Sequence, residues 1–140
     1  MRIAALLVLA LAACSPPAEQ PAATTAEIAQ TEGVSIVVAE PQTGAHVSSP
    51  LHVAGTAPGD WFFEAQFPAE LRAADGALIA EAPARAQSDW MTESPVPYAA
   101  DLEFDVERET QATLVLKEDM PSGLPGQREI SIPIVLEPAD

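Results

Sequence analysis

The sequence predicts an all-β domain that folds as an antiparallel sandwich of two sheets. Three observations favour this class. From residue 34 onward, short apolar runs are separated by proline, glycine and aspartate. Several of these runs alternate apolar with polar residues, which is the pattern of a half-buried strand. No run keeps the sustained period of an amphipathic helix. About seven short strands are expected on this basis.

The first part of the domain contains three expected strands. Residues 34–40 and 51–55 are apolar runs that end at turns rich in proline and glycine. Residues 60–67 form the next run, and alternate positions in it would share one face of a strand. We expect that face to be apolar, and it comprises Trp61, Phe63, Ala65 and Phe67.

The middle of the domain contains an expected hairpin and the clearest alternation in the chain. Asp75-Gly76 marks the hairpin turn, and the returning strand covers residues 77–86, where Pro83 could interrupt it. Residues 98–107 then predict a strand with one buried face and one solvated acidic face. The apolar face comprises Tyr98, Ala100, Leu102, Phe104 and Val106, and the other comprises Ala99, Asp101, Glu103, Asp105 and Glu107.

Residues 112–117 and 129–136 complete the set of strands. Because proline cannot donate to a ladder, Pro133 places the last strand at a sheet edge or lies at a bulge. The pattern as a whole is typical of an immunoglobulin-like sandwich, with Trp61 as the candidate core tryptophan. The Cys…Trp…Cys signature of antibody domains is absent.

The N-terminus predicts export and lipidation. One basic residue precedes an apolar run that is too short to cross a bilayer as a helix. The run ends in Leu11-Ala12-Ala13-Cys14, which resembles the bacterial lipobox. We therefore expect a signal peptide over residues 1–13, its removal, and a lipid on Cys14. The alternative is an ordinary signal peptide with an incidental cysteine.

Between the lipid and the domain, residues 14–33 predict a disordered tether. This segment is rich in Pro, Ala, Thr and Glu, and Ile28 is its only large apolar side chain. The folded domain is then expected over residues 34–137. Ser15 after the cysteine resembles the signal for outer-membrane sorting in Gram-negative bacteria, so the expected location is the cell envelope, facing the periplasm in such a host.

Charge and composition narrow the set of partners. The formal net charge is −15, from 6 basic and 21 acidic residues. Such a surface repels nucleic acid and anionic lipid headgroups, so the expected membrane contact is the lipid on Cys14. The acidity more often keeps an exported protein soluble, although cation binding remains open. With Cys14 as the only cysteine, no disulfide can form within the chain.

The sequence offers no recognisable catalytic or metal site, and no cofactor is expected. No G-x-S-x-G string is present, and the histidines are His46 and His52. Two histidines without free thiols supply at most half of a zinc site. The acidic residues of 98–107 lie about 7 Å apart along one strand face, too far for most of them to wrap one ion.

The most suggestive binding segment is a loop that combines aromatic, thioether and acidic side chains. Such a loop could stack on a sugar ring or hold a peptide. The other reading is that Trp90 and Met91 fold inward to plug the open end of the sandwich while Asp89 caps a turn. A second candidate loop covers residues 118–128. The candidate binding residues are Asp89, Trp90, Met91, Glu93 and Leu124.

Several strings resemble one family. They are P-Q-T-G-A-H-V-S-S-P-L-H-V-A-G at 41–55, W-F-F-E-A-Q-F-P at 61–68, D-W-M-T-E at 89–93 and P-S-G-L-P at 121–125. Together they are similar to the Gmad2 family, an immunoglobulin-like domain of bacterial spore-germination and related envelope proteins. The resemblance covers residues 34–136 and implies a binding or adhesion module without catalytic residues. Ser94-Pro95 and Met120 depart from the family's usual pattern.

The sequence thus predicts a lipid-anchored envelope protein whose domain binds another envelope protein or a cell-wall polymer without catalysis. The partner would contact the loops that contain Trp90 and Leu124, or it would pair with the edge strand 130–136. The alternative is a lipoprotein that binds a small molecule or cation on its acidic surface, and an enzyme is the third possibility.

Overall fold

The computed structural model describes residues 35–120 and 126–140. The predicted signal peptide, tether, Cys14 and Leu124 lie outside these residues. Within them, no helix is long and apolar enough to span a membrane. The elements in chain order are β1 Val37–Glu40, β2 His46–Val47, β3 Leu51–Ala57, the 3-10 helix η1 Gly59–Trp61, β4 Gln66–Ala73, β5 Leu78–Ala86, β6 Val96–Leu102, β7 Thr110–Lys117 and β8 Glu129–Leu136.

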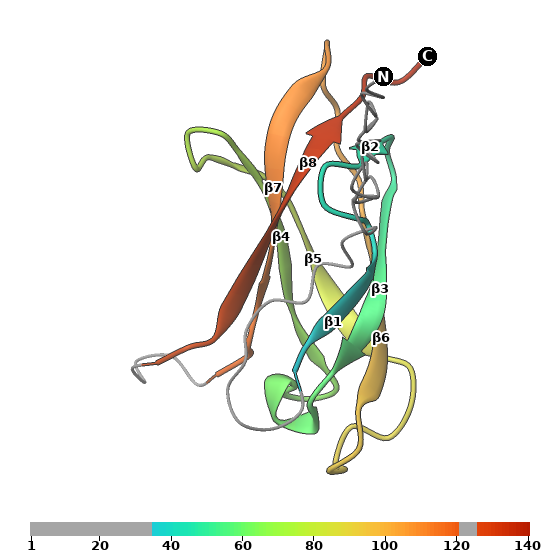
Figure 1. The fold of residues 1–140 in the computed structure, drawn as a ribbon, viewed down its shortest axis with the longest axis vertical. Coiled ribbons are helices and arrows are strands. Elements are labelled where there is room, and N and C mark those ends of the chain that lie inside the picture. The colour runs from blue at the N-terminus through green and yellow to red at the C-terminus, as the bar shows by residue number, and fades with distance from the viewer. Residues whose placement is uncertain (1–34, 121–125) are drawn as a thin grey trace, which may run out of the picture.

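The strands form one curled sheet in the order β1-β3-β6-β5-β4-β7-β8-β2 (Figure 1). Neighbouring strands are antiparallel except β2 and β8, which are parallel. The predicted all-β class is therefore confirmed. The expected separation into two sheets is not seen, because the last two residues of β5 pair with β6 through Arg85↔Ala99 and Ala86↔Tyr98. This short link joins the β1-β3-β6 half to the β4-β7-β8 half.

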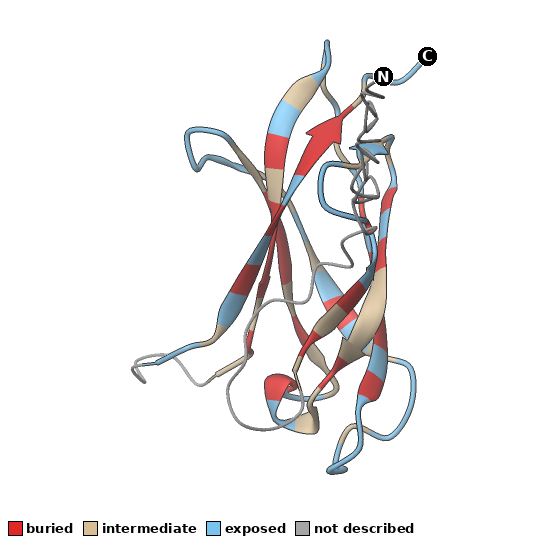
Figure 2. Ribbon diagram, viewed as in Figure 1, coloured by how far each residue is buried: buried red, intermediate tan, exposed pale blue. Residues whose placement is uncertain are grey.

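The core lies inside the curl, where the inward faces of both halves meet (Figure 2). Alternation along β6 and β8 places one residue in two inward, as the sequence predicts. Phe67 sits at the centre of an aromatic cluster, with ring centroids 5.8 Å from Trp61, 5.1 Å from Phe62 and 5.0 Å from Tyr98. All three contacts are edge-to-face, the geometry that aromatic rings favour.

The predicted strand over residues 60–67 is wrong. Its first residues belong to η1, and β4 begins only at Gln66. Trp61 and Phe62 are buried side by side, whereas Phe63 is 51% exposed, so the period of two fails here. Glu64 and Ala65 have φ of 51° and 66°, which turns the chain into β4. The core tryptophan is confirmed, but it lies in a helical turn and not on a central strand.

The hairpin at Asp75-Gly76 is confirmed. Gly76 has φ of 88°, which a residue with a side chain seldom adopts, and the Asp75 carboxylate accepts the backbone N–H of Ala77 at 3.0 Å. Pro83 does not interrupt β5, because it lies opposite Pro68 of β4 in a continuous register. Neither proline needs to donate a hydrogen bond to the other.

Two C-terminal strands differ slightly from expectation. β6 ends at Leu102, and beyond it the Phe104 N–H donates to the Ser49 hydroxyl at 3.0 Å instead of to a strand. β8 has the predicted bounds but is second from the edge in the strand order. Among the described residues, β2 covers only Val135 and Leu136 of β8, so Pro133 lies before the covered part, without a bulge.

Gly55 sets how closely β1 approaches β3. A Cβ on Gly55 would overlap the Val37 carbonyl, and the Tyr98 hydroxyl donates to that same carbonyl at 3.0 Å. Burial raises the pKa of Tyr98, so the phenol stays protonated and remains a donor. The absence of a side chain at Gly55 therefore lets β1 close over the core.

We expect Gly55→Ala to lower the free energy of unfolding by about 1–3 kcal/mol, because the added methyl group pushes β1 away from β3. Chemical denaturation measures the change. A Gly55→Ala/Tyr98→Phe double variant separates the causes: removal of the hydroxyl leaves the overlap with the Val37 backbone in place. Full recovery of stability in the double variant would contradict the backbone explanation.

Candidate functional site

Three connecting segments meet at one end of the domain, here called the loop end: η1 with the following turn (58–65), the β5–β6 loop (87–95), and the residues flanking β7 and β8 (118–120 and 126–128). A Cβ on Gly59 would overlap the carbonyls of Trp90 and Thr92, so the β5–β6 loop rests directly on η1. The Asp119 N–H donates to the Trp61 carbonyl at 3.0 Å, which ties the third segment to η1.

An ion-pair network holds the base of the loop end. The Glu118 carboxylate accepts three N–H groups of Arg128: the backbone N–H at 3.1 Å, Nε at 2.9 Å and Nη2 at 2.7 Å. Arg128 also lies 3.0 Å from an Asp60 oxygen, and its guanidinium stands 5.5 Å from the centre of the Trp61 ring. The hydrogen bonds from Arg128 lower the pKa of Glu118 although burial opposes this shift.

The predicted binding residues of the β5–β6 loop do not share one environment. The Asp89 carboxylate accepts the Met91 N–H at 3.0 Å, so Asp89 caps a turn. Trp90 is partly buried and packs against the core. Met91, in contrast, is 76% exposed, and Glu93 is exposed as well. Trp90 therefore folds inward, as one of the two interpretations predicts, whereas Met91 does not.

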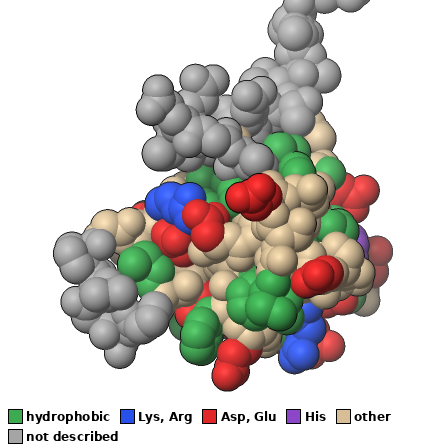
Figure 3. Space-filling view, turned by 90° about the horizontal axis from the view of Figure 1, so that it is seen from below, with side chains coloured by type: hydrophobic (Ala, Val, Ile, Leu, Met, Phe, Trp, Pro, Cys, Tyr) green, Lys and Arg blue, Asp and Glu red, His purple; other side chains and the backbone are tan. Residues whose placement is uncertain are grey.

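Phe63 is a loop-end residue that sequence reasoning missed. The alternation over residues 60–67 predicts Phe63 on the buried face of a strand, but the turn at Glu64 and Ala65 directs it outward. The missed signal is the run of adjacent aromatic residues 61–63 after Pro58-Gly59, because three neighbours cannot all occupy one strand face. Figure 3 views the domain from this end and shows hydrophobic side chains interspersed with acidic ones.

The charge of the loop end is predominantly negative. Its carboxylates belong to Asp60, Glu64, Asp89, Glu93, Glu118 and Asp119. Burial, with a smaller contribution from the Glu64 charge, raises the pKa of Asp119. Arg128, the basic residue within the described loop-end segments, is already paired with Glu118 and Asp60. The arrangement therefore offers exposed apolar side chains in a field that attracts cations and basic groups.

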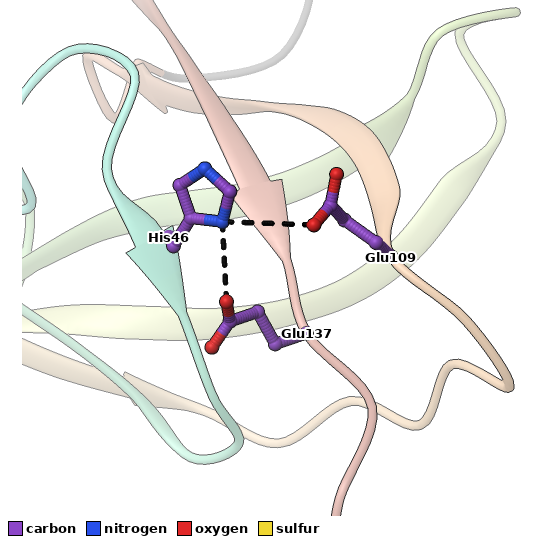
Figure 4. Close-up of side chains that lie close together, drawn as sticks. All are labelled: His46, Glu109 and Glu137. Atoms are coloured by element: carbon purple, nitrogen blue, oxygen red, sulfur yellow. Dashed lines mark hydrogen bonds and ion pairs between the residues drawn. The ribbon is translucent and has the colours of Figure 1, made fainter.

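The two histidines lie in separate places. His52 is exposed on the outer face of β3, and its Nδ1 lies 2.8 Å from the Asp101 carboxylate. His46 in β2 faces two other carboxylates, those of Glu109 and Glu137 (Figure 4). No sequence pattern groups these three residues, because β2 and the ends of β7 and β8 meet only in the folded sheet.

A second buried carboxylate stabilises the outer face of β4 and β7. Glu70 accepts hydrogen bonds from Arg72 Nε at 2.7 Å and Lys117 Nζ at 3.1 Å. Burial alone would raise the pKa of Glu70, but the hydrogen bonds and charges of Arg72 and Lys117 lower it overall. Glu70 and Glu118 thus share a preference for the ionised state.

We expect stability to decrease in acid, because both carboxylates have a lower pKa in the folded state than their ordinary value of 4.5. Their contribution is present above that value and is lost as pH falls through the lower folded pKa values. Glu118→Gln should cost about 1–3 kcal/mol at neutral pH and reduce the dependence of stability on pH below 4.5. Denaturation curves at several pH values test this, with exposed Glu107→Gln as the control; an unchanged acid dependence in Glu118→Gln would contradict it.

Comparison with known proteins gives a family. The model of Gmad2, described as an immunoglobulin-like domain of bacterial spore germination, matches residues 35–123, more than half of the chain. This match confirms the resemblance found in the sequence and supports the immunoglobulin-like class of the curled sheet. Comparisons with curated proteins and with solved structures found no match. The chain belongs to the Gmad2 family of immunoglobulin-like domains.

Proposed function

We propose that this chain is a lipid-anchored cell-envelope protein whose immunoglobulin-like domain binds an envelope protein or a cell-wall polymer without catalysis. In this proposal residues 1–13 are a signal peptide and Cys14 carries the lipid. The two halves of the curled sheet act as the two layers of a sandwich that presents the loop end. The family assignment supports a non-catalytic module of this kind.

The observation that carries the proposal is the exposure of large apolar side chains at the loop end. Met91 is 76% exposed and Phe63 is 51% exposed, on segments that both contact or adjoin η1. Water around such side chains is released when a partner covers them, which favours binding. The backbone around them is constrained by the close packing of the β5–β6 loop on Gly59 and by the Glu118–Arg128 pair. Little conformational entropy would therefore be lost when a partner binds.

The chemistry of the loop end favours a neutral or basic partner surface. Exposed carboxylates lie on the same two segments as Met91 and Phe63, so a polyanionic polymer would be repelled and a basic protein segment attracted. A protein partner with apolar and basic side chains therefore fits better than an acidic wall polymer. A neutral glycan would also be compatible, through stacking on the aromatic side chains.

The first described residues lie at the same end, where the proposed tether would join the domain. Val37 pairs with Thr56, near the end of β3 that leads into η1, so the described chain begins beside the loop end (Figure 1). A fully extended chain over residues 15–34 would reach at most about 70 Å from Cys14. Partners within that distance of the membrane surface are the ones the domain would meet.

We expect Cys14→Ser to release the protein from the membrane, because the thiol that carries the lipid is lost. Fractionation of cells followed by mass spectrometry of the N-terminal peptide measures both effects. The native chain should be recovered with membranes and begin at an acylated Cys14. A native peptide with a free thiol, or a Cys14→Ser chain that stays with the membrane, would refute lipid anchoring while leaving the loop-end proposal intact.

We expect Phe63→Ala/Met91→Ala to reduce the recovery of crosslinked partners from intact envelopes by about tenfold, which corresponds to a loss of 1.4 kcal/mol. Leu78→Ala is the matched control, because Leu78 is also 51% exposed but lies by the β4–β5 hairpin at the far end of β4. Trp90→Ala tests the inward-packed part of the loop. Equal recovery with Phe63→Ala/Met91→Ala and with Leu78→Ala would count against the loop end.

A further inference from the structure

Three side chains with metal-binding atoms converge at the end of the domain opposite the loop end. His46 lies in β2, Glu109 directly precedes β7, and Glu137 directly follows β8. The His46 Nδ1 lies 3.1 Å from an oxygen of Glu137 and 3.8 Å from an oxygen of Glu109 (Figure 4). One nitrogen and two oxygen atoms all fall within 4.8 Å of one another.

The sheet holds the backbone on which these side chains stand. The Glu137 N–H donates to the Val47 carbonyl at 2.9 Å, and the Val135 N–H donates to the Ala45 carbonyl at 2.9 Å. On the other side of β8, Thr110 pairs with Leu136. Each of the three residues is therefore part of a registered strand pair or next to one, and their approach does not depend on a free loop.

The charges at this end are not balanced in the way they are elsewhere in the domain. Glu70 is paired with Arg72 and Lys117, and Glu118 with Arg128. Glu109 and Glu137 meet only His46 among the ion pairs of the described residues. Two carboxylates that share one imidazole repel each other unless the ring is protonated or a metal cation lies between them.

We propose that His46, Glu109 and Glu137 bind a divalent transition-metal ion, with zinc as the representative case. Imidazole together with carboxylate oxygen is a ligand set that zinc accepts, and bonds of about 2.0–2.2 Å in a tetrahedron place ligand atoms about 3.4 Å apart. The distances of 3.1 and 3.8 Å from Nδ1 bracket that value. Small side-chain rotations bring all three atoms onto one ion.

Nδ1 is the ring atom of His46 that faces both carboxylates, so it is the atom that would bind the ion. Without an ion Nδ1 is hydrogen-bonded to Glu137, and on binding the ion would take the place of the proton on Nδ1. The ring proton then resides on Nε2, and water completes the coordination. Calcium and magnesium fit less well, because they prefer an all-oxygen shell.

Binding would connect three segments that are far apart in the chain. β2 is only two residues long and forms the edge of the sheet beside β8. An ion held by His46, Glu109 and Glu137 would fix this edge to the adjacent ends of β7 and β8. Zinc should therefore raise the melting temperature of the domain by several degrees when it saturates the site.

Zinc titration of the full-length chain tests the proposal. The protein should be free of a histidine tag and carry Cys14→Ser, so that no other strong ligand competes. We expect one zinc ion per chain, with affinity reduced at least tenfold in His46→Ala and in Glu137→Gln. His52→Ala is the matched control, because His52 has the same side-chain exposure of 53% as His46 and also faces a carboxylate.

Nuclear magnetic resonance of the two imidazole rings gives an independent reading in the unaltered protein. Zinc should shift the signals of His46 and leave those of His52 in place, while calcium should shift neither. Circular dichroism verifies that each variant is folded before its affinity is interpreted. Absence of zinc binding, equal shifts of both rings, or equal loss of affinity in His46→Ala and His52→Ala would overturn the proposal.

Discussion

The aromatic cluster around Phe67 is the interaction on which the rest of the domain depends. Phe67 belongs to β4, Tyr98 to β6, and Trp61 and Phe62 to η1 and its end, so one ring contacts both halves of the curled sheet and the segment that closes it. Each edge-to-face pair adds about 0.5–1.5 kcal/mol beyond the burial of area. In a chain whose only cysteine is Cys14, such packing takes the place of an intersheet disulfide.

The same cluster determines the shape of the loop end. Trp61 is buried by Phe67 on one side, while the Arg128 guanidinium stands over its ring. Arg128 in turn is hydrogen-bonded to Glu118, and the β5–β6 loop packs closely against Gly59 at the start of η1. Contacts that begin in the core therefore fix the backbone around Phe63 and Met91. If a partner binds these exposed apolar side chains, a backbone held by such contacts would need little ordering.

Sequence reasoning succeeded where one periodicity applied and failed where the chain changed direction. The bounds of β8 and the hairpin at Asp75-Gly76 follow from alternation and from turn chemistry. Apolar residues at alternate positions predict a strand over residues 60–67, but Trp61 and Phe62 are adjacent and both buried. A helical turn can bury two adjacent side chains, and the period of two that indicates a strand does not reveal such a turn.

The candidate sites show the same limit. Trp90 and Met91 could be singled out because they adjoin acids in a segment with poor alternation, but their different exposure depends on η1, which the sequence did not reveal. Positions 46, 109 and 137 are far apart in the chain and carry no motif. They meet because β2 pairs with β8 in parallel across the edge of the curled sheet.

The distribution of charge separates the two ends of the domain by chemistry. At the loop end, Arg128 compensates two carboxylates, and other acidic residues are exposed on the segments that carry Phe63 and Met91. At the opposite end, Glu109 and Glu137 depend on a histidine that is a cation only when protonated. A structural role for these two glutamates would be better served by lysine or arginine, as Lys117 and Arg72 do for Glu70. An imidazole in that position can exchange the proton on Nδ1 for a metal ion, and the proposed site uses this property.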